Sequence, residues 1–228
     1  MLGDAALRFL DFLHAAGIGV WQVLPLNPPD RHGSPYQSLS LSACSTALAD
    51  WRAVEAAGGL AGWLEPRAAR YATFCDREGG WLNDFAVYSV ATRELDPAWW
   101  NWPVGLRTHA PDAVAGFARQ HPSAVGEVRA RQHPSAVGEV RARQFVVFEQ
   151  WRAVQDAARA RGILLFGDLP LYPALASADV WANQDLFQLD REGQPVAVAG
   201  VPPAHFFATG QLGGNPLYAW DHMIRDGF

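Results

Sequence analysis

The sequence predicts an α/β fold in which helices cover a parallel sheet, as in a (β/α) barrel. Two short apolar runs, residues 20–26 and 163–166, each follow a stretch with helical periodicity and stop at segments rich in Pro or Gly. An unbroken apolar run suits a strand buried on both faces, which is typical of parallel sheets. A run this short could also lie in a buried helix, and periodicity alone does not decide. Gly162 before the second run and residues 167–170 (GDLP) after it favour a strand.

Asp168 stands at the C-terminal end of the second predicted strand. Barrel enzymes carry their chemistry at that end of the strands, so this carboxylate is the first candidate functional residue. A helix cap or a structural salt bridge is the alternative role for it.

Composition indicates a single-domain globular protein with one sizeable core. The chain has 228 residues, of which 50% are hydrophobic, and a net charge of −5. No basic cluster is present that would neutralise phosphates, so nucleic acid is not an expected partner. Cys44 and Cys75 are the two cysteines; they imply no disulfide framework and fit a reducing compartment.

Residues 1–14 predict an amphipathic surface helix that Gly17 ends. Apolar side chains recur there at helical spacing, with charged residues opposite. The segment lacks the basic start and the small-residue cleavage site of a signal peptide, and no apolar run approaches membrane-spanning length. We therefore expect a cytoplasmic protein without a membrane partner.

Between the two strands the chain is predicted to be a loop followed by helices. Residues 30–43 (DRHGSPYQSLSLSA) are rich in turn residues and hydroxyls, and composition alone favours an ordinary loop that faces water. Residues 45 to roughly 114 predict an Ala-rich helical insertion, broken at Gly58-Gly59, Gly79-Gly80 and Asp96-Pro97. Its spread of aromatic residues is more typical of core than of a ligand site. These residues are Trp51, Trp63, Tyr71, Phe74, Trp81, Phe85, Tyr88, Trp99, Trp100 and Trp102.

The sequence RQHPSAVGEVRA occurs at residues 119–130 and again, unchanged, at residues 131–142. Two units of this length are too few and too short for a solenoid. The Pro and Gly in each copy disfavour one continuous helix across both. We expect a tandem duplication with one copy looped out, and we expect His121 and His133 to be surface residues rather than a metal pair.

The last third begins with a predicted helix at residues 145–161, whose apolar stripe leads into the second strand. Ser177 is a candidate N-cap of a following helix. Residues 187–200 predict a small hairpin with its turn at residues 191–194. Residues 201–228 are rich in Pro, Gly and aromatic side chains, which is typical of a lid or a binding loop on a barrel rim.

The strings WQVLPL, GSPYQS, GDLP, SADVWA, AGVPP, TGQ and GNPLYAWD occur in this order. Together they resemble the amylomaltases, which are the 4-alpha-glucanotransferases of glycoside hydrolase family 77. The resemblance covers the beginning and the last third of the chain, and the middle matches mainly in helical character. It implies a (β/α)8 barrel that transfers α-1,4-glucan segments between malto-oligosaccharides, without a metal or an organic cofactor.

The resemblance also implies a retaining double displacement by an Asp nucleophile, a Glu acid/base and a second Asp. In the family these residues follow the NPLYAWD string, so we expect no catalytic residue within this chain. The first barrel strand of the family would precede it. The prediction is an incomplete TIM barrel with a helical insertion. Residues 1–44 and 144–228 form barrel parts, with strand 163–168 and a substrate-rim loop at 200–216, and residues 45–143 form the insertion, with the duplication at 119–142.

Substrate-binding roles carry over from the family to Ser34, Tyr36, Asp168, Gln211 and Asn215. By resemblance, Tyr36 and Asp168 contact the glucose at the cleavage point, and Ser34 offers a hydroxyl nearby. Gln211 and Asn215 belong to the rim loop over the acceptor sites. The structural alternatives are a packed loop aromatic for Tyr36 and turn-stabilising amides for Gln211 and Asn215.

The chain departs from the family at Ala176 and Ala204, where Asp is usual, and at Gly213, where Trp is usual. These changes remove polar contacts and a stacking platform for sugar. Two functional hypotheses remain, namely part of a 4-alpha-glucanotransferase and a non-catalytic α-glucan-binding remnant. An unrelated barrel enzyme that acts on phosphates is disfavoured, because no Gly-rich phosphate cradle opens a helix.

Overall fold

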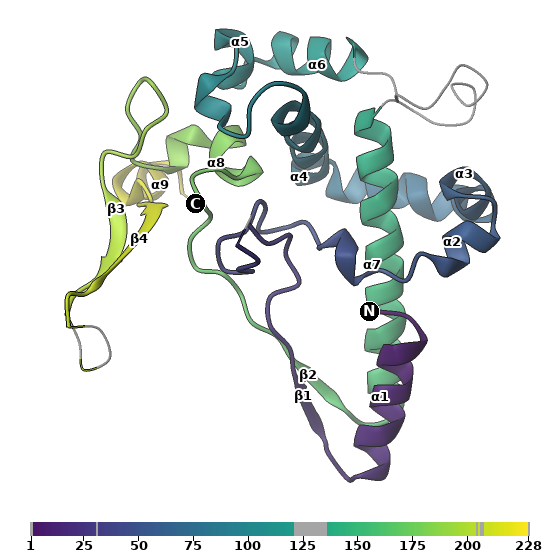
Figure 1. Cartoon of the computed structure of the whole chain (residues 1–228). Coiled ribbons are helices and arrows are strands. Elements are labelled where there is room, and N and C mark those ends of the chain that lie inside the picture. Colours follow the sequence, from purple (N-terminus) through teal and green to yellow (C-terminus); the bar gives the residue numbers. More distant parts are fainter. Residues whose placement is uncertain (1, 31, 121–135, 204, 206–207, 228) are drawn as a thin grey trace.

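The structure is a computed structural model that describes residues 2–30, 32–120, 136–203, 205 and 208–227. Helices dominate these residues, and strands form two separate pairs within them (Figure 1). The α-helices are α1 Asp4–Ala15, α2 Arg52–Ala56, α3 Leu60–Leu64, α4 Ala68–Glu94, α5 Val104–Arg107, α6 Pro111–Gln120, α7 Ala136–Ala160, α8 Ala178–Ala182 and α9 Trp220–Asp226. The 3-10 turns are η1 Thr46–Leu48, η2 Glu65–Arg67, η3 Trp99–Asn101 and η4 Gln184–Leu186. The strands are β1 Val20–Gln22, β2 Leu164–Phe166, β3 Val198–Val201 and β4 Gln211–Pro216.

The two predicted strands exist and are parallel neighbours, with Val20 opposite Leu164. α1 leads into β1 and α7 leads into β2, and the two helices lie side by side (Figure 1). Each helix ends at a glycine with positive φ, Gly17 at 71° and Gly162 at 67°. Glycine adopts this conformation without steric cost, which lets the chain reverse at once into its strand. The paired helix–glycine–strand units therefore place the two strands in parallel.

The predicted burial of these strands on both faces is wrong for the described residues. Val20, Leu164 and Phe166 are 53%, 70% and 61% exposed. Alternate side chains of a strand point to opposite faces, and Trp21 and Leu165, which point the other way, pack against the helical core. Only one face of the pair is thus covered, and the described residues form no closed barrel.

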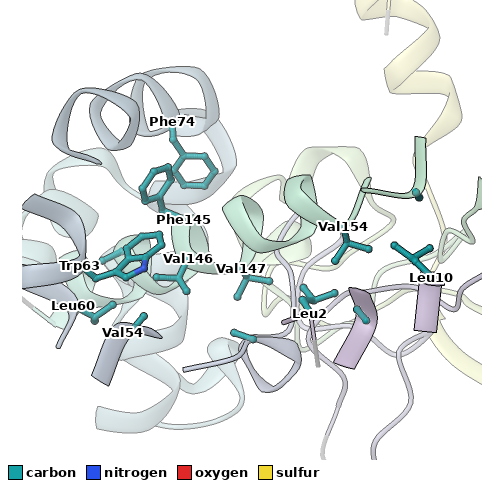
Figure 2. Close-up of a cluster of buried hydrophobic side chains, with 14 of the residues drawn as sticks. Leu2, Leu10, Val54, Leu60, Trp63, Phe74, Phe145, Val146, Val147 and Val154 are labelled. Atoms are coloured by element: carbon teal, nitrogen blue, oxygen red, sulfur yellow. The ribbon is translucent and has the colours of Figure 1, made fainter. Parts of the chain in front are cut away.

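The larger hydrophobic core forms where α7 crosses α4, α1 and the short helices α2 and α3 (Figure 2). Phe145 of α7 lies at its centre, with ring centroids 5.4 to 5.8 Å from those of Trp63, Tyr71 and Phe74. Leu10 of α1 and Val154 of α7 extend the same core toward β1 and β2. Because α7 carries the chain from this core directly into β2, the core fixes the position of the second strand.

A second core joins the C-terminal half of α4 to α8 and to the turns around η3. Trp181 of α8 packs its ring against Tyr88 and Trp102, with centroids 6.0 and 5.4 Å apart. The indole nitrogen of Trp181 donates to the carbonyl of Leu106 at 2.7 Å, which satisfies its one donor in a buried place. All ten predicted core aromatics lie in, or pack against, one of the two cores, which confirms that prediction.

The predicted breaks in the helical segment are correct at two places and wrong at the third. Gly58 and Gly59 separate α2 from α3 with φ of 81° and 99°, and α4 ends just before Pro97. Gly79 and Gly80, however, lie inside α4, which continues through them. Glycine inside a helix costs about 1 kcal/mol relative to alanine, and the buried side chains of α4 on both sides of the pair offset that cost.

The C-terminal third confirms the predicted cap and turn, and it adds a pair of strands that was not predicted. Ser177 caps α8, with its Oγ accepting from the backbone nitrogen of Val180 at 3.2 Å. Asp190 organises the predicted turn, since its Oδ1 accepts from two backbone nitrogens that follow it. Around this turn Leu189 and Pro195 form one isolated antiparallel bridge, so the predicted hairpin is present in a short form. A longer antiparallel pair follows, formed by β3 and β4. The segment expected to be an irregular rim loop is therefore partly a β-hairpin, because backbone pairing needs no alternation of side chains.

The two cysteines are free thiols, and both are half-buried. Burial raises the pKa of Cys44 to about 11, so this thiol stays protonated and unreactive at neutral pH. None of the described helices combines the length and apolarity needed to cross a bilayer.

Residues 121–135, with His121 and His133, lie outside the described residues. The end of the second copy is described, because residues 136–142 form the first turns of α7. Val137 and Ala142 are buried there, at 1% and 2% exposure. This part of the duplication belongs to the packed structure.

Deleting residues 131–142 gives the same chain as deleting residues 119–130, because the two copies are identical. In the product, Val125 and Ala130 stand where Val137 and Ala142 stood. We therefore expect the deletion to change the free energy of unfolding by less than about 1 kcal/mol, since loop length affects closure entropy only weakly. Urea unfolding of both chains measures this difference.

Val137→Ala is the matched control, and emptying that buried site should cost roughly 1–3 kcal/mol. A deletion that costs as much as this control would mean that both copies contribute packed residues.

Candidate functional site

The candidate site lies where two loops leave the strand pair. Parallel strands end at the same edge, so the loops after β1 and β2 start next to each other. They also bond to one another further along, since the backbone nitrogen of Ala178 donates to the carbonyl of Leu39 at 2.9 Å. The carboxylate of Asp179 accepts from the backbone nitrogen of Leu41 at 2.9 Å. This is the end of the strands at which barrel enzymes carry their chemistry.

Tyr36 and Asp168, one on each loop, are in direct contact. The phenol of Tyr36 donates to Oδ2 of Asp168 at 2.6 Å, and Oδ1 of Asp168 accepts from the backbone nitrogen of Leu169 at 2.8 Å. Tyr36 is 44% exposed and Asp168 is half-buried, so both side chains reach solvent. The structure thus brings together two residues that are far apart in the sequence, as the resemblance implied.

The structural alternatives for Asp168 do not match its surroundings. The next helix, α8, is capped by Ser177 rather than by Asp168. Asp168 takes part in none of the ion pairs found among the described residues. Its carboxylate is held by a phenol and one backbone nitrogen, which leaves lone pairs directed toward solvent.

The contact changes the acidity of the phenol. The hydrogen bond to Asp168, together with partial burial and the negative charge nearby, raises the pKa of Tyr36 above its usual 10.0. Ionisation would remove the donated proton and place two negative charges side by side. Tyr36 therefore remains a hydrogen-bond donor at neutral pH.

Asp30 shapes the loop that carries Tyr36. Its Oδ1 accepts from the backbone nitrogens of His32 at 2.9 Å and Ser34 at 3.0 Å, which closes an Asx turn. Ser34, predicted to lie near the sugar, is half-buried two residues before Tyr36.

Ser38 and Ser40, later in this loop, face inward and serve the fold. Ser38 is fully buried and donates to the carbonyl of Ser40 at 2.5 Å, while Oγ of Ser40 accepts from the backbone nitrogens of Ser42 and Ala43. The amide of Asn27 donates to the carbonyls of Ser40, Leu41 and Ala43. Internal hydrogen bonds therefore hold the loop in one conformation, and this conformation orients Tyr36.

The two rim-loop amides have different surroundings. Asn215 is 6% exposed near the end of β4, where its Oδ1 accepts from Nε2 of Gln37 at 2.8 Å. Gln211 is exposed at the other end of the same strand, opposite Val201. They are four residue steps apart along the strand, which is about 13 Å. Asn215 therefore belongs to the neighbourhood of Tyr36, and Gln211 lies apart from it.

Three residues that sequence reasoning left out also belong to the site, namely Gln37, Tyr172 and Tyr218. Gln37 links the first loop to Asn215. Tyr218 donates to the carbonyl of Leu171 at 3.1 Å and stacks on Tyr172 with centroids 5.5 Å apart. The signal was present, because each of the three stands beside or inside a string that carries the family resemblance.

The three positions that depart from the family pattern have different surroundings in the structure. Ala176 is half-buried next to the cap Ser177, and Ala204 lies outside the described residues. A Cβ on Gly213 would lie 3.1 Å from the carbonyl oxygen of Ala199 and 3.5 Å from Oδ1 of Asn215. A side chain at this position would therefore need a shift of a few tenths of an ångström in the hairpin.

The profile of glycoside hydrolase family 77, described as 4-alpha-glucanotransferase, matches residues 1–69 and 52–228. The chain belongs to this family. A 4-alpha-glucanotransferase of Thermus thermophilus is 36% identical over 262 aligned positions, which cover 100% of this chain and 50% of the relative. One from Aquifex aeolicus is 34% identical, also over 50% of its length. The chain thus spans about half the length of the curated relatives it matches.

Solved structures agree with this assignment to family 77. An amylomaltase from Streptococcus agalactiae in complex with acarbose matches with a TM-score of 0.82 and 28% identity, over 99% of this chain and 51% of that one. An amylomaltase from Corynebacterium glutamicum matches with a TM-score of 0.68 at 16% identity, which supports the fold alone. This family 77 chain therefore has the architecture of half an amylomaltase.

Replacing Asp168 with Asn should lower the pKa of Tyr36 toward its ordinary value, because the neutral amide no longer opposes ionisation of the phenol. Because the pKa of Tyr36 is higher in the folded than in the unfolded chain, the contact stabilises the fold below pH 10.0. This stabilisation is lost as the pH rises through the pKa of Tyr36 in the folded chain. Asp168→Asn should remove this alkaline dependence. Carbon-13 NMR of tyrosine labelled at Cζ measures the titration, and Tyr36→Phe assigns the signal among the five tyrosines. An unchanged Tyr36 titration in Asp168→Asn would contradict the contact.

Proposed function

We propose that this chain forms the part of a 4-alpha-glucanotransferase that holds an α-1,4-glucan at the cleavage point, through Tyr36 and Asp168. The observation that carries the proposal is the 2.6 Å hydrogen bond between them, at the carboxyl ends of two parallel strands. The activity proposed for the whole protein is transfer of α-1,4-glucan segments between malto-oligosaccharides. The acarbose-bound relative supports the choice of an α-glucan ligand.

The pair suits a sugar because of what each side chain can still bond. A carboxylate accepts about two hydrogen bonds on each oxygen. Tyr36 uses one site on Oδ2 and Leu169 uses one on Oδ1. One site on each oxygen is left, and neighbouring hydroxyls of a glucose unit are spaced to donate to both. Tyr36 is 44% exposed, so its aromatic ring can add an apolar surface for the sugar.

Bond cleavage in this proposal uses residues outside the chain. A retaining transfer requires a nucleophilic carboxylate and an acid/base carboxylic acid about 5 Å apart across the glycosidic bond. The family resemblance assigns none of these roles to a residue of this sequence. Tyr36 and Asp168 are proposed to hold the sugar against that machinery, with Ser34 nearby and Gln211 at the rim.

A chimera tests the proposal directly. In it, this chain replaces the matched half of the Thermus thermophilus relative, so that the relative supplies the carboxylates. We expect the chimera to convert maltotriose to glucose and longer oligomers. A folded chimera without this activity would contradict the proposal that the chain is part of an active 4-alpha-glucanotransferase.

The isolated 228-residue chain should bind acarbose without converting maltotriose. Equilibrium dialysis measures the binding, and release of glucose above a no-protein control measures the conversion. Turnover by the isolated chain would contradict the expectation that the catalytic carboxylates lie elsewhere. Binding by the chain alongside an inactive chimera would favour the alternative of a non-catalytic α-glucan-binding remnant.

Variants of Asp168 in the chimera test the role of the carboxylate. Asp168→Ala should lower kcat by more than it raises KM, because hydrogen bonds to the sugar strengthen as the ring flattens toward an oxocarbenium ion. A loss of 10- to 100-fold in kcat corresponds to about 1.4–2.7 kcal/mol of transition-state stabilisation. Asp168→Asn keeps the shape and should lie between the wild type and Asp168→Ala. Steady-state kinetics with maltotriose separate the two constants. An effect on KM alone would mean that Asp168 binds the substrate and the transition state equally well, which would contradict this prediction.

A further inference from the structure

Asn215 is a buried polar side chain that contacts both loops of the candidate site. Its Oδ1 accepts from Nε2 of Gln37 at 2.8 Å. Its Nδ2 donates to the carbonyls of Pro173 at 2.9 Å and Tyr172 at 3.3 Å. Both donors and one acceptor position of the amide are therefore occupied within the chain, and the side chain is 6% exposed.

These contacts fall close to the functional residues on each loop. Gln37 directly follows Tyr36, and Tyr172 and Pro173 follow Asp168 on the second loop. The loops therefore meet at the Tyr36–Asp168 hydrogen bond and at Asn215. Further along they are also joined by the bonds of Leu39 and Leu41 described above. Gln37 adds a further bond to the hairpin, since its Nε2 also donates to the carbonyl of Gly213 at 3.3 Å.

The two meeting points differ in how firmly they hold. The bond between Tyr36 and Asp168 is exposed, so water competes for both partners and the bond alone holds the loops weakly. The bond from Asn215 to Pro173 is buried, and removing one partner there would leave the other without a hydrogen bond and without water. Of these two contacts, the buried one at Asn215 lies in the same part of the loops as Tyr36 and Asp168 and can set the distance between them.

We propose that Asn215 is a positioning residue that, together with Gln37, holds Tyr36 and Asp168 at hydrogen-bonding distance. The residue acts through the loops and does not itself contact the sugar, which departs from the acceptor-site role implied by the family resemblance. The value of this positioning for catalysis rests on the proposed function of the Tyr36–Asp168 pair. The contact itself can be tested without any activity.

Titration of the labelled Tyr36 is the decisive measurement, because it senses the distance to Asp168 and not the overall stability. We expect Asn215→Ala and Gln37→Ala, made in the 228-residue chain, to lower the pKa of Tyr36 most of the way to its usual value of 10.0. Gln188→Ala is the matched control. Gln188 is an exposed glutamine whose Nε2 donates to the carbonyl of Tyr218 at 3.1 Å, and Tyr218 lies outside both loops. This control should titrate as the wild type does.

A purely structural role for Asn215 gives a different pattern. In that case the variant is less stable, but Tyr36 still titrates at its raised value in the folded chain, and the positioning role is overturned. Gln37→Ala removes one amide from a half-buried residue, so it decides by the same criterion if Asn215→Ala does not fold.

Acarbose binding separates this inference from the proposed function. If the wild-type chain binds acarbose, Asn215→Ala should weaken binding about tenfold, which is 1.4 kcal/mol, and Gln188→Ala should not. If the wild-type chain does not bind acarbose, the proposed function of the isolated chain fails. The Tyr36 titration then still decides whether Asn215 positions the pair.

Discussion

Parallel pairing of β1 with β2 sets the starting points of both loops that carry the candidate site. The pairing follows from two similar units, in which a helix ends at a left-handed glycine and the chain turns into a strand. Gly17 and Gly162 make these turns, and in each unit the next residue donates its backbone nitrogen back to the helix at 2.9 Å. Arg161 bonds to Asp11 at 2.7 Å and ties the ends of the two helices together. The site thus depends on contacts at the opposite end of the strands.

The helical part of the chain buries its large apolar side chains, whereas the strand pair leaves several of them exposed. Trp99, Trp181 and Leu82 are fully buried, and the two cores account for the large aromatic content. Leu164 and Phe166, in contrast, expose most of their side chains on the open face of the strand pair. Burying two such side chains would contribute about 3–6 kcal/mol. The stability of the chain therefore comes from the helices, and the strand pair is held mainly through α1 and α7.

Sequence reasoning succeeded where a local signal had a single physical meaning. The glycine after a helical pattern, the serine before α8 and the Asp190 turn each matched, because a short segment determines each of them. Burial of β1 and β2 was predicted wrongly, since apolar composition shows what a strand can bury and not what covers it. The predicted helix break at Gly79 and Gly80 was also wrong, because packing along the rest of α4 outweighed the low helix propensity of two glycines.

The candidate site shows the same division between local and distant information. The strings around Tyr36 and Asp168 identify the residues, but no local pattern shows that the phenol donates to the carboxylate. The contacts of Asn215 are harder still to foresee, because they join residues 37, 172, 173 and 215. Gly213 belongs to the same arrangement. Where the family pattern has a tryptophan, this chain has a glycine whose carbonyl accepts from Gln37, and a Cβ there would approach Asn215. The hairpin thus reaches the site through backbone and amide contacts, and its position governs how the two loops meet.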